Sequence, residues 1–173
     1  FDSVLTVDPH LHRIAALEEA VPARRAVALS AAPLIGAHLA ARTPRPLLLG
    51  PDAESEQWVK AAAGTEFDCA VCTKKRSGDH DVRIELPDVA LRGRHVVLVD
   101  DVASTGGTLV ECARRALGAG AARVDAAVTH ALLDADAAAR LAAAGINDLA
   151  STDTVPHASN RIGVAALLGN ALR

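Results

Sequence analysis

Short apolar runs alternate with alanine-rich stretches along most of this 173-residue sequence. The apolar runs have the length and composition of strands, and the stretches between them are long enough to be helices. The pattern predicts strands at residues 3–7, 27–29, 46–49, 67–72, 94–99, 123–130 and 149–152, and helices at residues 53–63, 105–117, 134–144 and 161–172. Because such alternation is typical of βαβ units, we expect an α/β fold with a parallel, doubly wound sheet flanked by helices.

The composition excludes several classes of function. Aromatic residues make up only 2%, which argues against a surface that stacks nucleic-acid bases. The net charge of −3 leaves no broad basic footprint for nucleic acid or an acidic membrane. The longest apolar stretch, residues 26–41, is interrupted by polar residues, Pro33 and Gly36, and a spanning helix needs roughly 20 mainly apolar residues. We expect a protein that binds small molecules, with no nucleic-acid or membrane partner.

Two of the three cysteines, Cys69 and Cys72, form a Cys-x-x-Cys pattern that also occurs in redox and zinc sites. Here the pattern falls on the predicted strand 67–72, where residues three apart point to opposite faces. No second pair of cysteines or histidines has zinc-ligand spacing around it. We therefore interpret the cysteines as ordinary free thiols, and their odd number fits a reducing cytoplasm.

The segment most typical of a binding site follows the unbroken apolar run Val96–Val99, which indicates a central strand buried on both faces. Asp100 and Asp101 come directly after that run and are expected to lie at the carboxyl edge of the sheet, where open α/β sheets bind ligands. The turn residues that precede the next helix are Ser104, Thr105, Gly106, Gly107 and Thr108.

This turn has the composition of a phosphate cradle. Its hydroxyls, its backbone N–H groups and the start of the helix can surround an anion, and the two glycines permit close approach and positive φ. The neighbouring carboxylates can accept hydrogen bonds from sugar hydroxyls. The sequence therefore predicts a sugar-phosphate site; the structural alternative is a solvated aspartate pair beside a capping turn. Neither of the common nucleotide-binding loops, G-x-x-x-x-G-K-[ST] or G-x-G-x-x-G, occurs.

Two further segments carry candidate residues. Lys74–Arg83 is polar and highly charged, shows no strand or helix periodicity, and is expected to be an exposed loop with a functional role. Asp8 and His10 lie just past the first predicted strand, two residues apart and so on one face. A carboxylate and a histidine at this spacing suit a metal ion, although a histidine at the end of a strand is also commonly structural.

The segment Asp100–Thr108 resembles the ribose 5-phosphate loop of the type I phosphoribosyltransferase fold. Other segments narrow the resemblance to the ribose-phosphate pyrophosphokinases, which make phosphoribosyl pyrophosphate (PRPP). Phe1–His10 is similar to that family's strand ending in Asp-x-His, and Lys74–Arg76 to the Lys-x-Arg of its catalytic loop in the shorter archaeal form. Its Pro-Asp turn and its closing segments are matched by residues 49–52, 152–156 and 162–168.

The resemblance implies a magnesium-assisted transfer of pyrophosphate from ATP to O1 of ribose 5-phosphate, with release of AMP. It gives Lys74 and Arg76 the catalytic role, on a loop that closes over the nucleotide. It further implies that ribose 5-phosphate is bound by Asp100, Asp101, Ser104, Thr105, Gly106, Gly107 and Thr108, and Mg²⁺ by Asp8, His10 and Asp52. A homo-oligomer is implied by the resemblance alone.

Two departures from the family pattern concern the same site. Ser104 stands where many members carry a third aspartate, and Glu54 and Glu56 stand where small residues or glycines are usual. These differences leave open an altered sugar phosphate or a paralogue with reduced activity.

The chain also matches only part of the family's two-halved architecture. Residues 1–25 correspond to the end of the N-terminal half and residues 26–173 to the C-terminal half, so we expect a fragment that lacks the ATP-gripping segment. Two alternatives remain: a phosphoribosyltransferase that consumes PRPP, and a non-catalytic regulatory subunit that binds the sugar phosphate.

Overall fold

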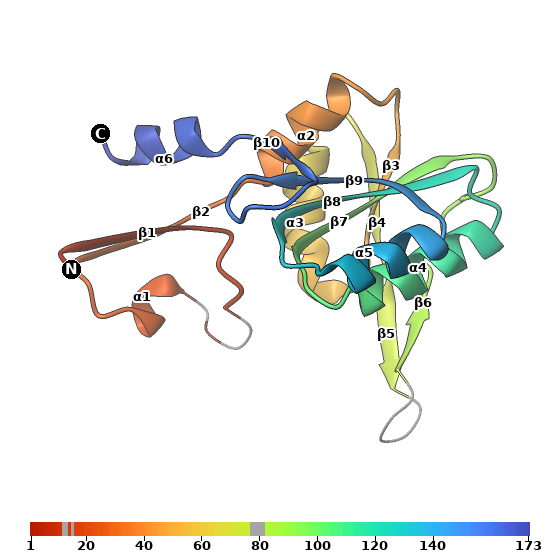
Figure 1. Cartoon of the computed structure of the whole chain (residues 1–173), viewed down its shortest axis with the longest axis horizontal. Coiled ribbons are helices and arrows are strands. Elements are labelled where there is room, and N and C mark those ends of the chain that lie inside the picture. The colour runs from red at the N-terminus through yellow and green to blue at the C-terminus, as the bar shows by residue number, and fades with distance from the viewer. Residues whose placement is uncertain (12–13, 15, 77–81) are drawn as a thin grey trace.

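A computed structural model describes residues 1–11, 14, 16–76 and 82–173 and shows an α/β fold (Figure 1). Its main sheet is six-stranded and parallel, with the strand order β10-β9-β8-β7-β3-β4. The strands are β3 (Leu47–Gly50), β4 (Asp68–Val71), β7 (His95–Ala103), β8 (Arg123–Ala131), β9 (Ile146–Thr152) and β10 (Asn160–Ile162). The expected parallel sheet flanked by helices is confirmed.

Helices cover both faces of this sheet. One face packs against α2 (Ala32–Ala40) and α3 (Glu56–Ala63), and the other against α4 (Gly107–Gly118) and α5 (Ala135–Ala143). Alternate residues of β7 divide between the two layers: Val96 and Leu98 join the core beneath α4 and α5, whereas Val97 and Val99 join the core beneath α2 and α3. This two-sided burial is why the run contains no polar residue.

A second, small sheet lies beside the main one. Its strands, β1 (Ser3–Val7) and β2 (Arg25–Leu29), are parallel and are connected through the short helix α1 (Leu17–Ala20). The last helix, α6 (Ala165–Ala171), lies near it, and the Arg25 guanidinium donates a hydrogen bond to the carbonyl of Ala171. The proposed division between residues 1–25 and 26–173 stays a prediction, and it falls within β2.

The polar segment 74–83 was predicted as an exposed loop, and this prediction is wrong for its described residues, 74–76 and 82–83, which lie in strands. Strands β5 (Thr73–Arg76) and β6 (Val82–Glu85) form an antiparallel hairpin that projects from the domain (Figure 1). The two strands pair with each other. The polar sequence of β5 and the shortness of β6 hide the hairpin in the sequence, although Ile84 of β6 is buried in the core beneath α4 and α5. Residues 77–81 lie outside the described part of the chain.

Three other elements differ from expectation. Helix α2 was not predicted, because only the strand 27–29 was expected within the apolar stretch 26–41, and Pro33, which lies in the first turn of the helix, reads as an interruption. The predicted helix 161–172 begins only at Ala165, since residues 160–162 form β10 beside β9. The predicted helix 53–63 is divided into the 3₁₀ turn η1 (Ala53–Ser55) and α3. None of the helices in the described ranges is long and apolar enough to cross a membrane.

Candidate active site

The predicted site residues meet at the carboxyl edge of the main sheet, next to the end of β1. Asp100 and Asp101 lie within β7 rather than after it, because the strand continues to Ala103. As successive strand residues they point to opposite faces. Asp101 lies on the side of α2 and α3, where it meets His10, and Asp100 lies on the side of α4.

Asp100 is an unusual carboxyl group. Burial, followed by the negative charges of Asp101 and Asp52, raises the pKa of Asp100 from 3.8 to about 8. Its own side chain accepts a hydrogen bond from the backbone N–H of Asp101 at 3.0 Å. Near neutral pH the group is therefore largely protonated and can donate as well as accept a hydrogen bond.

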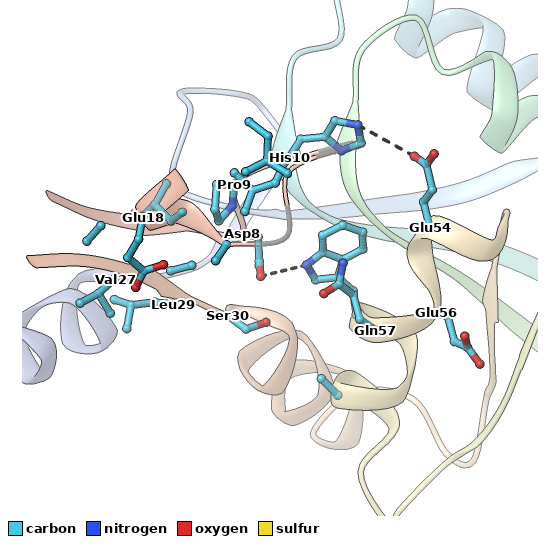
Figure 2. A pocket seen from close by; sticks show the side chains of 18 of the residues that line it. Asp8, Pro9, His10, Glu18, Val27, Leu29, Ser30, Glu54, Glu56 and Gln57 are labelled. Carbon is cyan, nitrogen blue, oxygen red and sulfur yellow. Dashed lines mark hydrogen bonds and ion pairs between the residues drawn. The ribbon is translucent and has the colours of Figure 1, made fainter. Parts of the chain in front are cut away.

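His10 is paired with the second aspartate. Its Nδ1 lies 2.7 Å from Oδ2 of Asp101, whose side chain is only 4% exposed. Since a carboxylate oxygen accepts, Nδ1 of His10 donates to Asp101. Nε2 faces Oε2 of Glu54 at 4.0 Å (Figure 2). A histidine whose other nitrogen donates to a carboxylate has the arrangement usual for metal-binding histidines.

Asp8 has a different environment from His10. It is 4% exposed, and its two carboxylate oxygens accept hydrogen bonds from the backbone N–H of Ala31, Nε1 of Trp58 and Oγ1 of Thr129. Its predicted role as a metal ligand stays a prediction, but a metal ion would have to compete with all three donors. Sequence reasoning missed Trp58 and Thr129, because nothing local marks them as partners of a residue so far away.

Asp52 connects the turn after β3 to the projecting hairpin. Its Oδ1 accepts hydrogen bonds from the backbone N–H groups of Glu54 and Ser55 and so caps the turn η1. Its Oδ2 forms an ion pair with Nζ of Lys74 on β5. The structure therefore brings Lys74 to the same edge as the aspartates. Arg76 is the last residue of β5, and its side chain lies outside the described part of the structure.

The two glutamates that depart from the family pattern have different partners. Glu56 pairs with Lys60 one turn along α3, at 2.6 Å on the exposed side of the helix. Glu54, in contrast, lies opposite His10. Both line a cavity of about 1030 Å³ between the β1–β2 sheet and α3. Only Glu54 therefore adds negative charge next to the predicted site.

The predicted phosphate turn joins β7 to α4. Ser104 and Thr105 are exposed, and Gly107 begins the helix. Gly106 has φ +72°, which residues with a side chain rarely adopt, and a Cβ on it would lie 2.3 Å from Cδ1 of Leu141, so any other residue would strain the backbone and displace that side chain. The first N–H groups of α4 have no partner within the helix and, with the dipole, favour an anion at this position.

Arg140 of α5 was not predicted as part of this region. Its guanidinium donates a hydrogen bond to the carbonyl of Thr105 at 3.2 Å and so ties the turn to the helix packed beside it. No signal in the sequence links two residues 35 positions apart on separate elements. The contact places one further positive charge beside the turn.

No three His, Cys, Asp or Glu side chains of the described residues are grouped as ligands of one metal ion. Asp52 and His10 lie at the edge, whereas Asp8 is turned into the domain. Cys69 on β4 is exposed, and Cys72, the residue after β4, is buried. Sγ of Cys72 contacts Sγ of Cys112 on α4 at 3.5 Å.

Known proteins are similar to this chain in sequence and in fold. Residues 82–168, half of the chain, match the family model described as the phosphoribosyl synthetase-associated domain. Over 177 residues the chain is 39% identical to the ribose-phosphate pyrophosphokinase of Methanopyrus kandleri, an alignment that covers 99% of this chain and 58% of that protein. The chain belongs to the ribose-phosphate pyrophosphokinase family.

Other members and a solved structure agree with this assignment. Ribose-phosphate pyrophosphokinase 2 of Archaeoglobus fulgidus is 43% identical over 143 residues, which cover 81% of this chain and 51% of that protein. The crystal structure of phosphoribosylpyrophosphate synthetase from Mycobacterium smegmatis has the same fold, with a TM-score of 0.77 over 99% of this chain and 58% of that one, at 24% identity. The chain thus spans about half the length of the family members that it matches.

Proposed function

We propose that this chain supplies the ribose 5-phosphate site of a ribose-phosphate pyrophosphokinase. In this reaction O1 of the sugar attacks the β-phosphorus of ATP, loses its proton and displaces AMP. The observation that carries the proposal is the junction of β7 and α4, where an aspartate pair on the strand adjoins a glycine turn that opens a helix. Family membership supports the reaction, and the local geometry supports the sugar phosphate as its ligand.

The sugar would be held by groups of two kinds. The 5-phosphate would be bound by the turn Ser104–Thr108 and the first N–H groups of α4. The ribose hydroxyls would lie against Asp100 and Asp101. Because the pKa of Asp100 is raised to about 8, this pair can offer a donor and several acceptors to a diol at neutral pH.

Lys74 and Arg76 would act on the transferred group. Phosphoryl transfer depends on the neutralisation of charge on the phosphoryl oxygens more than on covalent chemistry. Lys74 Nζ, in its ion pair with Asp52, is held at the edge where the sugar would bind. We propose that the two cations contact the triphosphate when the hairpin closes over it.

Mg²⁺ is the proposed metal ion, and the donors of this chain fit it in part. Mg²⁺ in phosphotransferases is commonly held by one or two protein carboxylates together with substrate phosphates and water. Asp52 supplies such a carboxylate, and His10 lies at the same edge of the sheet, paired with Asp101. When bound, the ion would neutralise negative charge on the phosphates.

The wider setting of the chain is also a proposal. We infer that ATP is gripped by residues outside this chain, since the family members it matches are nearly twice as long. A homo-oligomer and a cytoplasmic location are proposed on the family's resemblance, and the three free cysteines agree with a reducing compartment.

The experiment is calorimetry and product analysis on the full-length protein with Mg²⁺. We expect heat from ribose 5-phosphate binding and release of AMP from ATP only when the sugar phosphate is present. Ribose without the phosphate is the matched control and should give neither signal. Absence of both signals with ribose 5-phosphate would refute the proposal, whereas release of pyrophosphate from PRPP in the presence of a base would identify a phosphoribosyltransferase instead.

A further inference from the structure

We propose that Thr129 and His130, at the carboxyl end of β8, are positioning residues: they hold the turn that aims His10 at Asp101. The inference rests on the proposed function, because the reaction that they would serve is the proposed one. All their described hydrogen bonds go to residues other than His10. They would therefore act through Asp8, two residues before His10.

The backbone at Asp8 explains why a clamp is needed. Asp8 has φ +39°, in the left-handed region that a residue with a side chain rarely adopts. The backbone N–H of Asp8 donates to the carbonyl of Leu29 on β2 at 2.8 Å. The bend at Asp8 therefore comes immediately after the last hydrogen bond between β1 and β2. A backbone of this kind persists only where surrounding contacts hold it in place.

Thr129 supplies one of those contacts. Its side chain is fully buried, and its hydroxyl donates to Oδ2 of Asp8 at 2.7 Å, the shortest of the three hydrogen bonds to that carboxylate. The same oxygen accepts the N–H of Ala31 at the start of α2, and Oδ1 accepts Nε1 of Trp58 on α3. Residues of three separate elements therefore hold the Asp8 carboxylate. One of these elements, β8, is paired directly with β7, the strand that carries Asp101.

His130 supplies the second contact, on the backbone side of the turn. Its Nε2 lies 3.0 Å from the carbonyl oxygen of Val7 and 3.1 Å from that of Asp8. Because a carbonyl oxygen only accepts, Nε2 carries the proton. On the other side of the ring, Nδ1 lies 2.8 Å from Oγ1 of Thr154. The ring thus bridges the turn after β1 to the segment after β9.

Thr129 and His130 lie on the strand adjacent to the one that carries Asp101. His130 of β8 pairs in register with Val102 of β7, the residue after Asp101. Thr129 and His130 therefore tie the turn that carries His10 to the strand that carries its partner. A displacement of about 1 Å at the turn would break the 2.7 Å contact between His10 and Asp101.

The first test replaces Thr129 in the full-length protein. Thr129→Val removes the hydroxyl and keeps the shape, and Thr129→Ser keeps the hydroxyl as the matched control. The stoichiometry of ribose 5-phosphate binding gives the number of folded sites, so that kcat can be expressed per site. We expect kcat per site to fall about tenfold or more in Thr129→Val and to stay near the wild-type value in Thr129→Ser. The Kd of ribose 5-phosphate should stay within about twofold, since the turn 104–108 is unchanged.

A second pair of variants tests His130 in the same way. His130→Gln keeps a side-chain N–H donor for the carbonyls of the turn, and His130→Leu removes it. We expect His130→Leu to lose kcat per site and His130→Gln to retain most of it. If Thr129→Val does not fold, the comparison of kcat per site between these two His130 variants tests the proposal in its place.

A merely structural role would give another result. It would lower the number of binding sites and leave kcat per site unchanged, and that outcome would overturn the proposal. A crystal structure of Thr129→Val tests the geometry without activity: His10 should leave hydrogen-bond distance of Asp101, and an unchanged 2.7 Å contact would contradict us even if the wild-type protein released no AMP. Absence of AMP release by the wild type would refute the proposed function instead.

Discussion

The carboxylate of Asp52 forms an ion pair with Nζ of Lys74 and so joins the turn after β3 to the first strand of the hairpin. The same carboxylate caps the turn η1 through its other oxygen. One side chain thus fixes the backbone that follows β3 and sets the resting position of the cation proposed for catalysis. The pair also shows that the hairpin is attached at its base, although it projects from the domain.

The first prediction concerns Lys74. In the full-length protein, Lys74→Ala should lower kcat by about 10²–10³-fold, because one preorganised positive charge on the transferred group is lost. The Kd of ribose 5-phosphate should change little. Lys60→Ala is the control, since Lys60 pairs with Glu56 on an exposed helix face and should keep normal kcat. Equal kcat in Lys74→Ala and the wild type would contradict the proposed role.

The second prediction concerns pH. The pKa of Asp100 is about 8 in the folded protein and 3.8 ordinarily, so between these values the folded state binds more protons than the unfolded state. The contribution of Asp100 to stability is therefore complete below about pH 4 and is lost as the pH rises toward 8, at up to about 1.4 kcal/mol per pH unit. Asp100→Asn should lack this component.

The measurement is urea unfolding between pH 5 and pH 8. The free energy of unfolding of the wild type should fall more steeply with pH than that of Asp100→Asn. Parallel curves for the two proteins would show that Asp100 is ionised at neutral pH in the folded state.

The third prediction concerns the phosphate turn. Gly106→Ala would place a Cβ against Leu141 at a residue with positive φ, and we expect a loss of about 1–3 kcal/mol in stability and at least about tenfold weaker binding of ribose 5-phosphate. Gly118→Ala is the control within the same helix, because nothing lies within 4 Å of its added Cβ. It should be neutral or slightly stabilising. Thermal unfolding and calorimetry measure both effects, and equal behaviour of the two variants would contradict the prediction.

The fourth prediction concerns the cysteines. Cys69 is exposed, whereas Cys72 and Cys112 are buried against each other. Within residues 1–173 of the native protein, a chromogenic disulfide reagent should therefore modify one thiol rapidly, and all three after denaturation. Peptide mapping should find the fast label on Cys69. Rapid labelling of Cys72 would show that the base of the hairpin opens in solution.

Local patterns were sufficient to predict most strands of the main sheet and the residues of the phosphate turn. The apolar stretches at 47–49, 96–99 and 126–128 arise because both faces of β3, β7 and β8 are covered there, and they are visible without coordinates. The hairpin was missed because β5 is polar throughout and the alternation of apolar and charged residues in β6 covers only four positions.

The sequence by itself determined the doubly covered sheet and the position of the aspartates and the glycine turn along it, since these depend on residue type and spacing over a few positions. Only the tertiary structure decided what each side chain near the edge contacts. Asp8 and His10, two residues apart, read alike as metal ligands, yet one is bonded to Trp58 and Thr129 inside the domain and the other to Asp101. Those partners lie 50, 121 and 91 residues away, and the packing of separate elements, not any local pattern, brings them together.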